Sequence, residues 1–367
     1  NVAGSFTVAG KDLTVTVRLE EGSNVWTGKA SDTAPETKTE NGVTWYLIKT
    51  PEELAWFAAK VNGGETTINA RIMVNLVLNS TEAPKANRWG GIGKYSAQFG
   101  GILDGNGKTI SGYYSCDNDA TYESASALSG YLGADGVIKN VTLVGMIEGN
   151  GAIGAFANQS YGRIEGCVSR VNVTNAASYG GVTGGIAARV YASGAIVNCG
   201  NEGSVTCTLS SAYSDAKVGG IVGAGWSEGA IVNCYNTGSV TTGYACPAGG
   251  ICGSNSGLDI YNCYNVGTID SSGSQRGRAI GGHNNGSYTV SDCYYLEGCD
   301  DDPASNGWYT GTALSCVVSV TAMSKADMRS QKLVDALNCN GAAYAAVQGS
   351  YPVLAWEAER SPATHTV

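Results

Sequence analysis

The chain has 367 residues, of which 53 are Gly and 14% are charged, and its formal net charge is −9. This negative balance, without a basic run, excludes nucleic acid and anionic membrane surfaces as partners, because both attract clustered Lys and Arg. No apolar run is long enough to cross a bilayer, so we expect no direct membrane insertion.

Residues 1–45 are expected to form N-terminal strands, either the edge of a preceding domain or a cap. They open with NVAGSFTVAGKDLTVTVRL, whose alternation is typical of strands already under way. The same stretch lacks the charged-then-apolar pattern of a signal peptide. We therefore expect a mature or excised segment of a longer protein, with neighbouring domains of the same polypeptide as partners.

Residues 46–98 predict an N-terminal cap that contains a helix. In TPEELAWFAAKVN, Thr50 and Glu53 have the spacing of a capping box, and Pro51 occupies the first helical position. The apolar face of this helix comprises Leu54, Phe57, Ala58 and Val61. Such a cap would cover open backbone groups at one end of the adjoining β-structure.

Residues 99–298 consist of an internal repeat. AIVNCYNTGSV, Ala230 to Val240, has close copies that begin at Ala195 and Asp259. An apolar residue three positions before the Cys position recurs every 26 to 35 residues, at Ile110, Ile138, Ile164, Ile196, Ile231, Ile260 and Val290. The Cys position itself holds Tyr113, Val141, Cys167, Cys199, Cys234, Cys263 and Cys293. Six residues later, most units carry a second apolar residue, namely Ile147, Val173, Val205, Val240 and Ile269.

Each unit holds three short strand-like pieces separated by Gly or Asn, and no helical period intervenes. A piece this short cannot bury a face alone, so neighbouring units must stack. Three strands per turn, each stacked on its equivalent in the next turn, predict an all-β parallel β-helix of about seven coils. Short helices in the N- and C-terminal segments would cover its two ends.

The Asn-Cys pair of the repeat has a structural explanation. The apolar anchor and the Cys both point inward, so the chain must turn between them, and Asn198, Asn233 and Asn262 tolerate the left-handed backbone of that turn. Cys is small and readily buried, which suits a narrow core. The better disulfide candidates are the Cys residues outside the repeat position, namely Cys116, Cys207, Cys246, Cys252, Cys299, Cys316 and Cys339. Of these, Cys246 and Cys252 could pair across a local turn.

Residues 299–367 predict a C-terminal cap. TAMSKADMRSQKLVDALN, Thr321 to Asn338, is the helical segment of this region. Its buried face is expected to comprise Met328, Leu333 and Leu337. YPVLAW, Tyr351 to Trp356, is expected to be a closing strand.

These motifs resemble the GLUG-repeat family of bacterial secreted and cell-surface proteins. GGIVGAGWSEGAIVNCYNTGSV, Gly219 to Val240, matches the family repeat almost end to end. The lead-in RWGGIGKYSAQFGGILDGNGKTISG, the tail MSKADMRSQKLVDALN and the closing YPVLAW are similar to the family's flanks, so the resemblance covers residues 46–356.

The resemblance implies a right-handed β-helix in a bacterial protein that is exported to the cell surface or the extracellular space. It implies no catalytic residue, because the family repeat is a structural unit found in adhesins and beside the separate zinc domain of IgA peptidases. This chain has no HExxH motif, and its histidines are His283 and His365.

Tyr235, Tyr264 and Tyr294 come directly after the Cys position in successive coils. If the Cys faces inward, these rings should stack as an exposed ladder, and aromatic faces are good platforms for sugar rings or protein partners. Trp226 and Tyr244 lie in bends of the same region and could enlarge the patch. The alternative is a ladder that only stabilises itself.

Acidic residues give two further hypotheses. Asp300, Asp301 and Asp302 in one loop, and Asp117, Asp119 and Glu123 in another, could hold calcium, although neither matches a known calcium loop and solvated acidic loops are common. No other cofactor is expected. The acids of the repeats fall at differing positions, so no catalytic pair is predicted among Glu165, Glu202, Glu228, Asp259 and Asp292. Asp104 belongs to an Asp-Gly-Asn-Gly turn.

The sequence therefore favours a module for cell adhesion, or for binding a glycan or a host protein, on a lateral face of the β-helix. No catalytic residue is assigned. The alternatives are a β-helix enzyme that cleaves polysaccharides as a hydrolase or lyase, and a structural stalk of a larger protein.

Overall fold

The computed structural model describes residues 25–117, 126–176, 181–208, 216–226, 228–243, 246–271, 277–300, 307–339 and 341–360, without the side chains of residues 117, 308–317 and 360. The strands predicted within residues 1–24 lie outside the described residues, as do Tyr244, Asp301 and Asp302.

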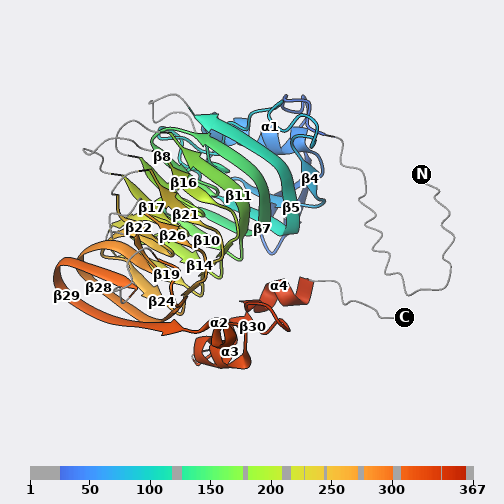
Figure 1. Ribbon diagram of the computed structural model, residues 1–367. Coiled ribbons are helices and arrows are strands. Elements are labelled where there is room, and N and C mark those ends of the chain that lie inside the picture. Colours follow the sequence, from blue (N-terminus) through green and yellow to red (C-terminus); the bar gives the residue numbers. More distant parts are fainter. Residues whose placement is uncertain are drawn as a thin grey trace, which may run out of the picture.

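The chain forms a parallel β-helix, whose coils stack in sequence order from one end to the other (Figure 1). Its first wall contains the apolar anchors, in β5 (Ile102–Asp117), β7 (Val137–Gly149), β10 (Arg163–Glu165), β14 (Ala195–Val197), β19 (Ala230–Val232), β24 (Asp259–Tyr261) and β28 (Gly281–Leu296). β28 pairs along its outer side with β29 (Trp308–Met323).

The second wall begins after the Asn-Cys turn. It contains β11 (Val168–Asn175), β15 (Gly200–Asn201), β20 (Tyr235–Asn236) and β25 (Tyr264–Asn265), and then β16 (Val205–Cys207), β21 (Val240–Thr242) and β26 (Ile269–Asp270). The third wall is built by the Gly-Gly segments. One stack comprises β8 (Ala152–Gly154), β12 (Val182–Gly184), β17 (Lys217–Gly219), β22 (Ala248–Gly249) and β27 (Gly277–Arg278). The other comprises β6 (Ser129–Leu132), β9 (Ala157–Ser160), β13 (Ala187–Tyr191), β18 (Val222–Trp226) and β23 (Cys252–Ser256).

The predicted register holds from the second anchor onward. Ile164 pairs with both Ile138 and Ile196, and the same ladder continues through Ile231, Ile260 and Val290. The first coil differs, because Ile138 pairs with Leu103 and not with Ile110, and Tyr113 lies opposite Gly145. An extra left-handed turn at Asn106 and Gly107 (φ 50° and 74°) shifts the register of β5, which the expected spacing did not include.

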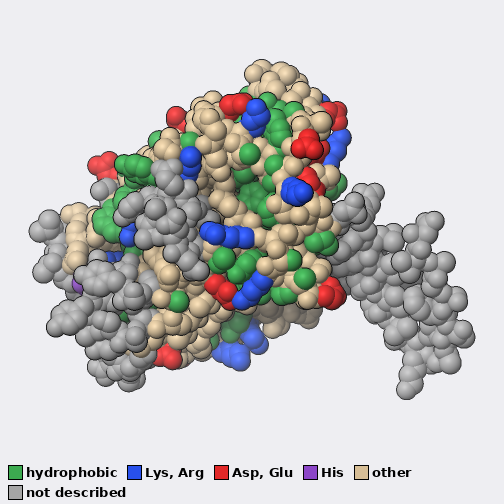
Figure 2. Space-filling model, turned by 90° about the horizontal axis from the view of Figure 1, so that it is seen from above, with side chains coloured by type: hydrophobic (Ala, Val, Ile, Leu, Met, Phe, Trp, Pro, Cys, Tyr) green, Lys and Arg blue, Asp and Glu red, His purple; other side chains and the backbone are tan. Residues whose placement is uncertain are grey.

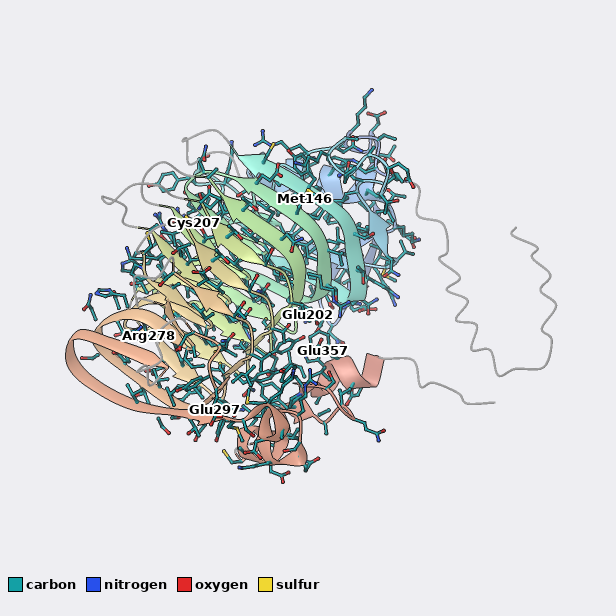
Figure 3. All side chains as sticks on the ribbon, viewed as in Figure 1. Met146, Glu202, Cys207, Arg278, Glu297 and Glu357 are labelled. Atoms are coloured by element: carbon teal, nitrogen blue, oxygen red, sulfur yellow. The ribbon has the colours of Figure 1, made fainter. Side chains whose placement is uncertain are left out.

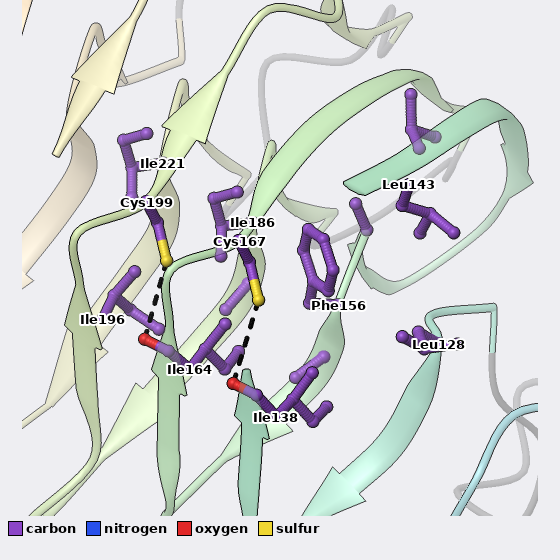
Figure 4. Packing of buried hydrophobic residues seen from close by; sticks show 14 of the residues in the cluster. Leu128, Ile138, Leu143, Phe156, Ile164, Cys167, Ile186, Ile196, Cys199 and Ile221 are labelled. Atoms are coloured by element: carbon purple, nitrogen blue, oxygen red, sulfur yellow. Dashed lines mark hydrogen bonds between the residues drawn. The ribbon is translucent and has the colours of Figure 1, made fainter. Parts of the chain in front are cut away.

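The corner asparagines adopt the expected left-handed backbone. Asn198, Asn233 and Asn262 have φ values of 52°, 53° and 57°, which turn the chain between the anchor and the Cys. The Cys side chains then point inward beside the anchors, and the Cys199 thiol donates to the Ile164 carbonyl at 3.6 Å (Figure 4). These contacts confirm the core role of the Cys position.

A second ladder of asparagines lies inside the coils. The Asn201 amide nitrogen donates to the Asn236 side chain at 2.8 Å, and that of Asn236 donates to Asn265 at 2.7 Å. Each nitrogen also donates to the carbonyl of the corner glycine two residues on, at Gly203, Gly238 and Gly267. Stacked amides of this kind satisfy buried polar groups along the axis of the coils.

None of the candidate cysteines forms a disulfide among the described side chains. Every cysteine with a described side chain is a free thiol, which leaves only the Cys316 side chain outside the description. Cys246 packs in a small cluster with Val218 and Val240, whereas Cys252 packs in the main core, so the two side chains belong to different clusters. Burial raises the pKa of the Cys252 thiol to about 12, which makes it a poor nucleophile.

The N-terminal region packs on the first coil. It comprises β1 (Glu36–Glu40), β2 (Val43–Ile48), α1 (Pro51–Asn62), β3 (Asn69–Ile72) and β4 (Leu76–Val77). The capping box of Thr50 and Glu53 is present, and Pro51 is the first helical residue. All the apolar residues predicted for its inner face are buried.

The C-terminal region departs from the expectation of one helix and a closing strand. The helical segment is divided into α2 (Lys325–Met328) and α3 (Gln331–Leu337), because Ser330 caps a second helix. Tyr351 to Trp356 supplies only β31 (Val353–Leu354), which pairs with β30 (Tyr344–Ala345) before α4 (Ala355–Arg360) begins. Within the described residues the longest helix has 12 residues, and no helix is long and apolar enough to cross a membrane.

Candidate functional site

The tyrosine ladder forms, but it is not exposed. Tyr235 and Tyr264 stack with ring centroids 5.5 Å apart and planes 12° from parallel, and Tyr294 lies next in register. The exposed fractions of Tyr235 and Tyr264 are 2% and 0%, so the expectation of an exposed face is wrong at these two rings. Tyr294 is half-buried.

The C-terminal region covers this ladder. One buried cluster contains Tyr235 and Tyr264 together with Met328, Leu333 and Leu337. The predicted apolar face of the helical segment is therefore buried against the stacked tyrosines. This region therefore lies along the side of the coils in Figure 1, although it was expected to cover an end.

Hydrogen bonds hold the C-terminal region to the coils. The Tyr344 hydroxyl lies 2.9 Å from the Asn262 carbonyl and 3.2 Å from that of Cys234. The Tyr264 hydroxyl donates to the Pro352 carbonyl, and the Trp356 indole donates to the Asn198 carbonyl at 3.2 Å. A ligand could reach the stacked rings only if these contacts opened.

Two carboxyl groups meet at one tyrosine hydroxyl under this cover. The Tyr235 hydroxyl lies 3.0 Å from a carboxyl oxygen of Glu202 and 3.0 Å from one of Glu357, and Figure 3 labels both acids where the C-terminal region meets the coils. Glu202 also accepts from Arg170 at 2.7 Å. Sequence reasoning set Glu202 aside and did not consider Glu357, since only the folded chain brings α4 to this coil.

The two acids compete for one proton of the Tyr235 hydroxyl. A hydroxyl has one proton to donate, so Tyr235 can donate to only one of the two carboxyl groups and can accept from Glu357 when that acid is protonated. Burial raises the pKa of Glu357 to about 7, with the neighbouring Glu202 charge adding to the effect. Arg170 forms an ion pair with Glu202 at 2.7 Å.

A buried acid with a raised pKa beside a second carboxyl group is typical of general acid and base catalysis. Here the Tyr235 hydroxyl lies within hydrogen-bond distance of both acids. We therefore interpret Glu202, Tyr235 and Glu357 as a hydrogen-bonded contact between the coils and the C-terminal region. While the Tyr235 hydroxyl is in place, it excludes a substrate atom from the space between the two carboxyl groups.

A second aromatic stack is open to solvent. Tyr161 and Tyr191 stack at 4.9 Å, and Tyr191 and Trp226 stack at 5.2 Å, with planes 12° apart in both pairs. The three rings come from consecutive coils at the ends of β9, β13 and β18, and all three are half-buried. Trp226 was predicted as a site residue, whereas Tyr161 and Tyr191 were missed because they lie outside the Asn-Cys motif.

Polar and aromatic neighbours extend this stack. The Arg189 guanidinium lies 5.8 Å from the centre of the Trp226 ring, and its buried Nε has no hydrogen-bond partner in the described residues. Tyr95, which is 64% exposed, contacts the Tyr131 ring edge-on at 5.7 Å. The Gln159 amide donates to the Tyr131 hydroxyl at 2.8 Å.

The remaining acidic residues have local roles where they are described. Asp300 accepts a hydrogen bond from the Ala279 amide at 3.1 Å, and no group of three metal-ligating side chains occurs in the described residues. The calcium hypothesis for Asp300, Asp301 and Asp302 stays a prediction. Asp104 accepts from the Asn106 amide at 2.9 Å, as a turn residue does. Acidic and basic side chains are interspersed on the face shown in Figure 2.

Comparison with known proteins supports the fold. No protein-family profile matches the chain, and no curated protein matches it. Among solved structures, the chain is similar to a candidate immunoglobulin A1 protease from Bacteroides ovatus, with a TM-score of 0.63 and 19% sequence identity. The match covers 89% of this chain and 94% of the other. At this identity the likeness shows a shared β-solenoid fold.

Proposed function

We propose that this protein is a bacterial surface or extracellular module that binds a glycan or a host protein through a lateral face of its β-helix. The observation that carries this proposal is the half-exposed stack of Tyr161, Tyr191 and Trp226 on consecutive coils. The setting is supported by the resemblance of the repeats to the GLUG family. Adhesion would result if the bound glycan or protein belongs to a cell surface.

The chemistry of the stack favours a saccharide. Sugar rings have apolar faces that pack on aromatic rings and polar edges that need hydrogen-bond donors and acceptors. Arg189 supplies a donor beside Trp226 and forms no ion pair in the described residues. A rigid coil holds these groups in position before a ligand arrives, which reduces the entropic cost of binding.

The proposal does not include protease chemistry. The neighbour's name describes an immunoglobulin A1 protease, but this sequence contains no HExxH motif, and its histidines are His283 and His365. Binding and display therefore account for the described residues better than peptide hydrolysis does.

The proposal is tested by screening the protein on a glycan array and measuring the affinity for any sugar that binds. We expect Trp226→Ala and Tyr191→Ala each to weaken binding about tenfold or more, since stacking on an aromatic ring and its polar contacts together contribute roughly 1–3 kcal/mol. The matched control is Tyr114→Ala, a half-buried aromatic residue in β5.

Circular dichroism and thermal melting must show that the variants fold. Equal binding by Trp226→Ala and the native protein would contradict the assignment of this face. If no sugar on the array binds and no host surface protein is captured, the results would instead favour the hypothesis of a structural stalk.

A further inference from the structure

The left-handed corners of the coils form a ladder of amides that ends at a carboxylate. The corner position holds Asn198, Asn233, Asn262 and then Asp292, whose φ of 55° matches the others. The Asn233 amide nitrogen donates to the Asn198 oxygen at 2.9 Å, and that of Asn262 donates to the Asn233 oxygen at 2.7 Å. Along the ladder, each amide thus donates to the corner of the coil before it.

Asp292 interrupts the ladder, because an ionised carboxylate has no proton to donate. The Asn262 side-chain oxygen is therefore buried without a hydrogen-bond partner in the described residues, and Asn262 is only 8% exposed. A buried acceptor without a donor costs free energy comparable to a lost hydrogen bond. The described residues supply no hydrogen-bond donor for the Asn262 side-chain oxygen.

A cavity of about 430 Å³ lies at this point of the ladder. It opens between the corners of consecutive coils and the loop after α3, and its walls include Tyr261, Asn262, Ser291 and Asp292 on one side and Gly341 and Ala343 on the other. Asn262, which carries the unpartnered oxygen, and Asp292 thus line one space.

The cavity carries negative charge. Asp292 forms no ion pair in the described residues and accepts one hydrogen bond, from the Ser291 hydroxyl at 3.1 Å. Asp259 lies beside the Tyr261 ring, where it accepts from the Thr289 amide at 2.7 Å, and it also forms no ion pair there. The Asp292 carboxylate, the Asn262 amide and the Tyr261 ring therefore line the space, and the Asp259 carboxylate lies behind the Tyr261 ring.

We propose that this cavity binds an alkylammonium group, carried by an amino sugar or by a lysine side chain. An ammonium has three donors and no acceptor, so it can satisfy Asn262 and Asp292 together. Its charge complements the Asp292 carboxylate, and the Tyr261 ring provides a cation–π surface. A calcium ion fits less well, because calcium takes 6–8 oxygen ligands and Asp292 is the only carboxylate among the lining residues.

This site is separate from the aromatic stack of the proposed function. It lies on the corner between the first and second walls and is lined by neither Arg189 nor Trp226. A substitution at Asp292 that abolishes ammonium binding should leave glycan binding to the aromatic stack unchanged. One proposal can therefore be wrong while the other is correct.

The test measures binding by titration calorimetry and by NMR shifts, with glucosamine and Nα-acetyl-lysine methylamide as ammonium probes. Glucose is the uncharged control for the sugar arm. We expect either ammonium probe to bind at least about tenfold more tightly than glucose, because its hydrogen bonds are charge-assisted. The tighter of the two probes identifies the source of the ammonium.

Asp292→Asn separates binding from folding. The new amide completes the ladder by donating to Asn262, so the variant should lose about tenfold or more in ammonium affinity while its melting temperature is kept or raised. Asp32→Asn removes an equal charge at a distant exposed position and should bind as the native protein does.

Three results would overturn the proposal. The first is no binding of either ammonium probe, as expected if the amide ladder runs in the opposite sense and Asn262 donates to Asp292. The second is equal binding by Asp292→Asn and the native protein. The third is an affinity for glucose equal to that for the tighter of the two ammonium probes.

Discussion

Two aromatic stacks on the same β-helix have the same geometry and opposite surroundings. Tyr235 and Tyr264 stack with planes 12° apart, as do Tyr191 and Trp226, and in both cases the rings come from consecutive coils. The first pair is fully covered by the C-terminal region, whereas the second is half-exposed. Stacking is thus a property of the repeat, while access to a ligand depends on a segment outside the repeat.

The largest expected effect comes from weakening the cover of the buried stack. Leu337→Ala removes a fully buried side chain between α3 and the tyrosines, and should destabilise the docked C-terminal region by about 2–5 kcal/mol. Hydrogen exchange would show faster exchange in residues 325–357 with little change in the coils. Val347→Ala, at a 38% exposed position of the same region, is the control. Unchanged exchange in Leu337→Ala would mean that this contact does not hold the cover.

The contrast between the stacks should also depend on pH. The pKa of Glu357 is about 7 in the folded protein against an ordinary value of 4.5, so the folded state binds its proton more tightly. The stabilisation is complete below pH 4.5 and is lost as pH rises through 7, by up to about 3 kcal/mol for a shift of this size. Tyr235, Glu202 and Arg170 are the charged and titratable groups that face it.

Thermal melting or Trp356 fluorescence between pH 4 and 8 would measure this dependence. Glu357→Gln should remove most of it, and Glu359→Gln, on the exposed side of α4, should leave it intact. A native protein whose C-terminal region is equally stable at pH 5 and pH 8 would contradict the assigned protonation of Glu357.

A smaller effect is expected at the hydroxyl between the two acids. Tyr235→Phe keeps the stacked ring but leaves Glu357 without its hydroxyl partner, which should cost about 1–3 kcal/mol of docking at pH 5. Protection of α4 against hydrogen exchange is the measurement. Tyr351→Phe, in the same region, should have less effect, and equal protection in the Tyr235→Phe variant and the native protein would show that the tie contributes nothing.

An effect on stability no larger than that of Tyr235→Phe is expected at the open stack. Tyr191→Ala removes two ring contacts, each contributing about 0.5–1.5 kcal/mol, from a face without a cover in the described residues. Tyr191→Phe should retain most of this stability, as judged by thermal melting. A loss as large as that of Leu337→Ala would show that the open stack supports the fold as much as the covered region does.

Most of the fold could be predicted from the sequence because the repeat is periodic. The ladder from Ile138 to Val290 and the left-handed asparagines result from one motif, since equivalent residues of successive coils must stack. The prediction for the first coil was wrong at Ile110, which does not pair with Ile138. An inserted turn at Asn106 changes the register there without changing the apolar pattern.

The candidate site was less predictable. Trp226 was identified, but Tyr161 and Tyr191 have no shared motif with it, and their alignment is visible only once β9, β13 and β18 stack. The cover of Tyr235 had a signal in Met328, Leu333 and Leu337, an apolar face in need of a partner. The sequence did not show which surface that face would meet.

The amino-acid sequence by itself determined the coil: its anchors, its inward Cys positions and its Asn corners. These features depend on contacts between equivalent positions of neighbouring coils, so a local pattern specifies them. The tertiary structure alone decided which aromatic stack is open, and it brought Glu357 to Tyr235 and placed Gly341 and Ala343 against the corner at Asp292. These contacts join residues far apart in the chain through shape and burial, which no repeat period encodes.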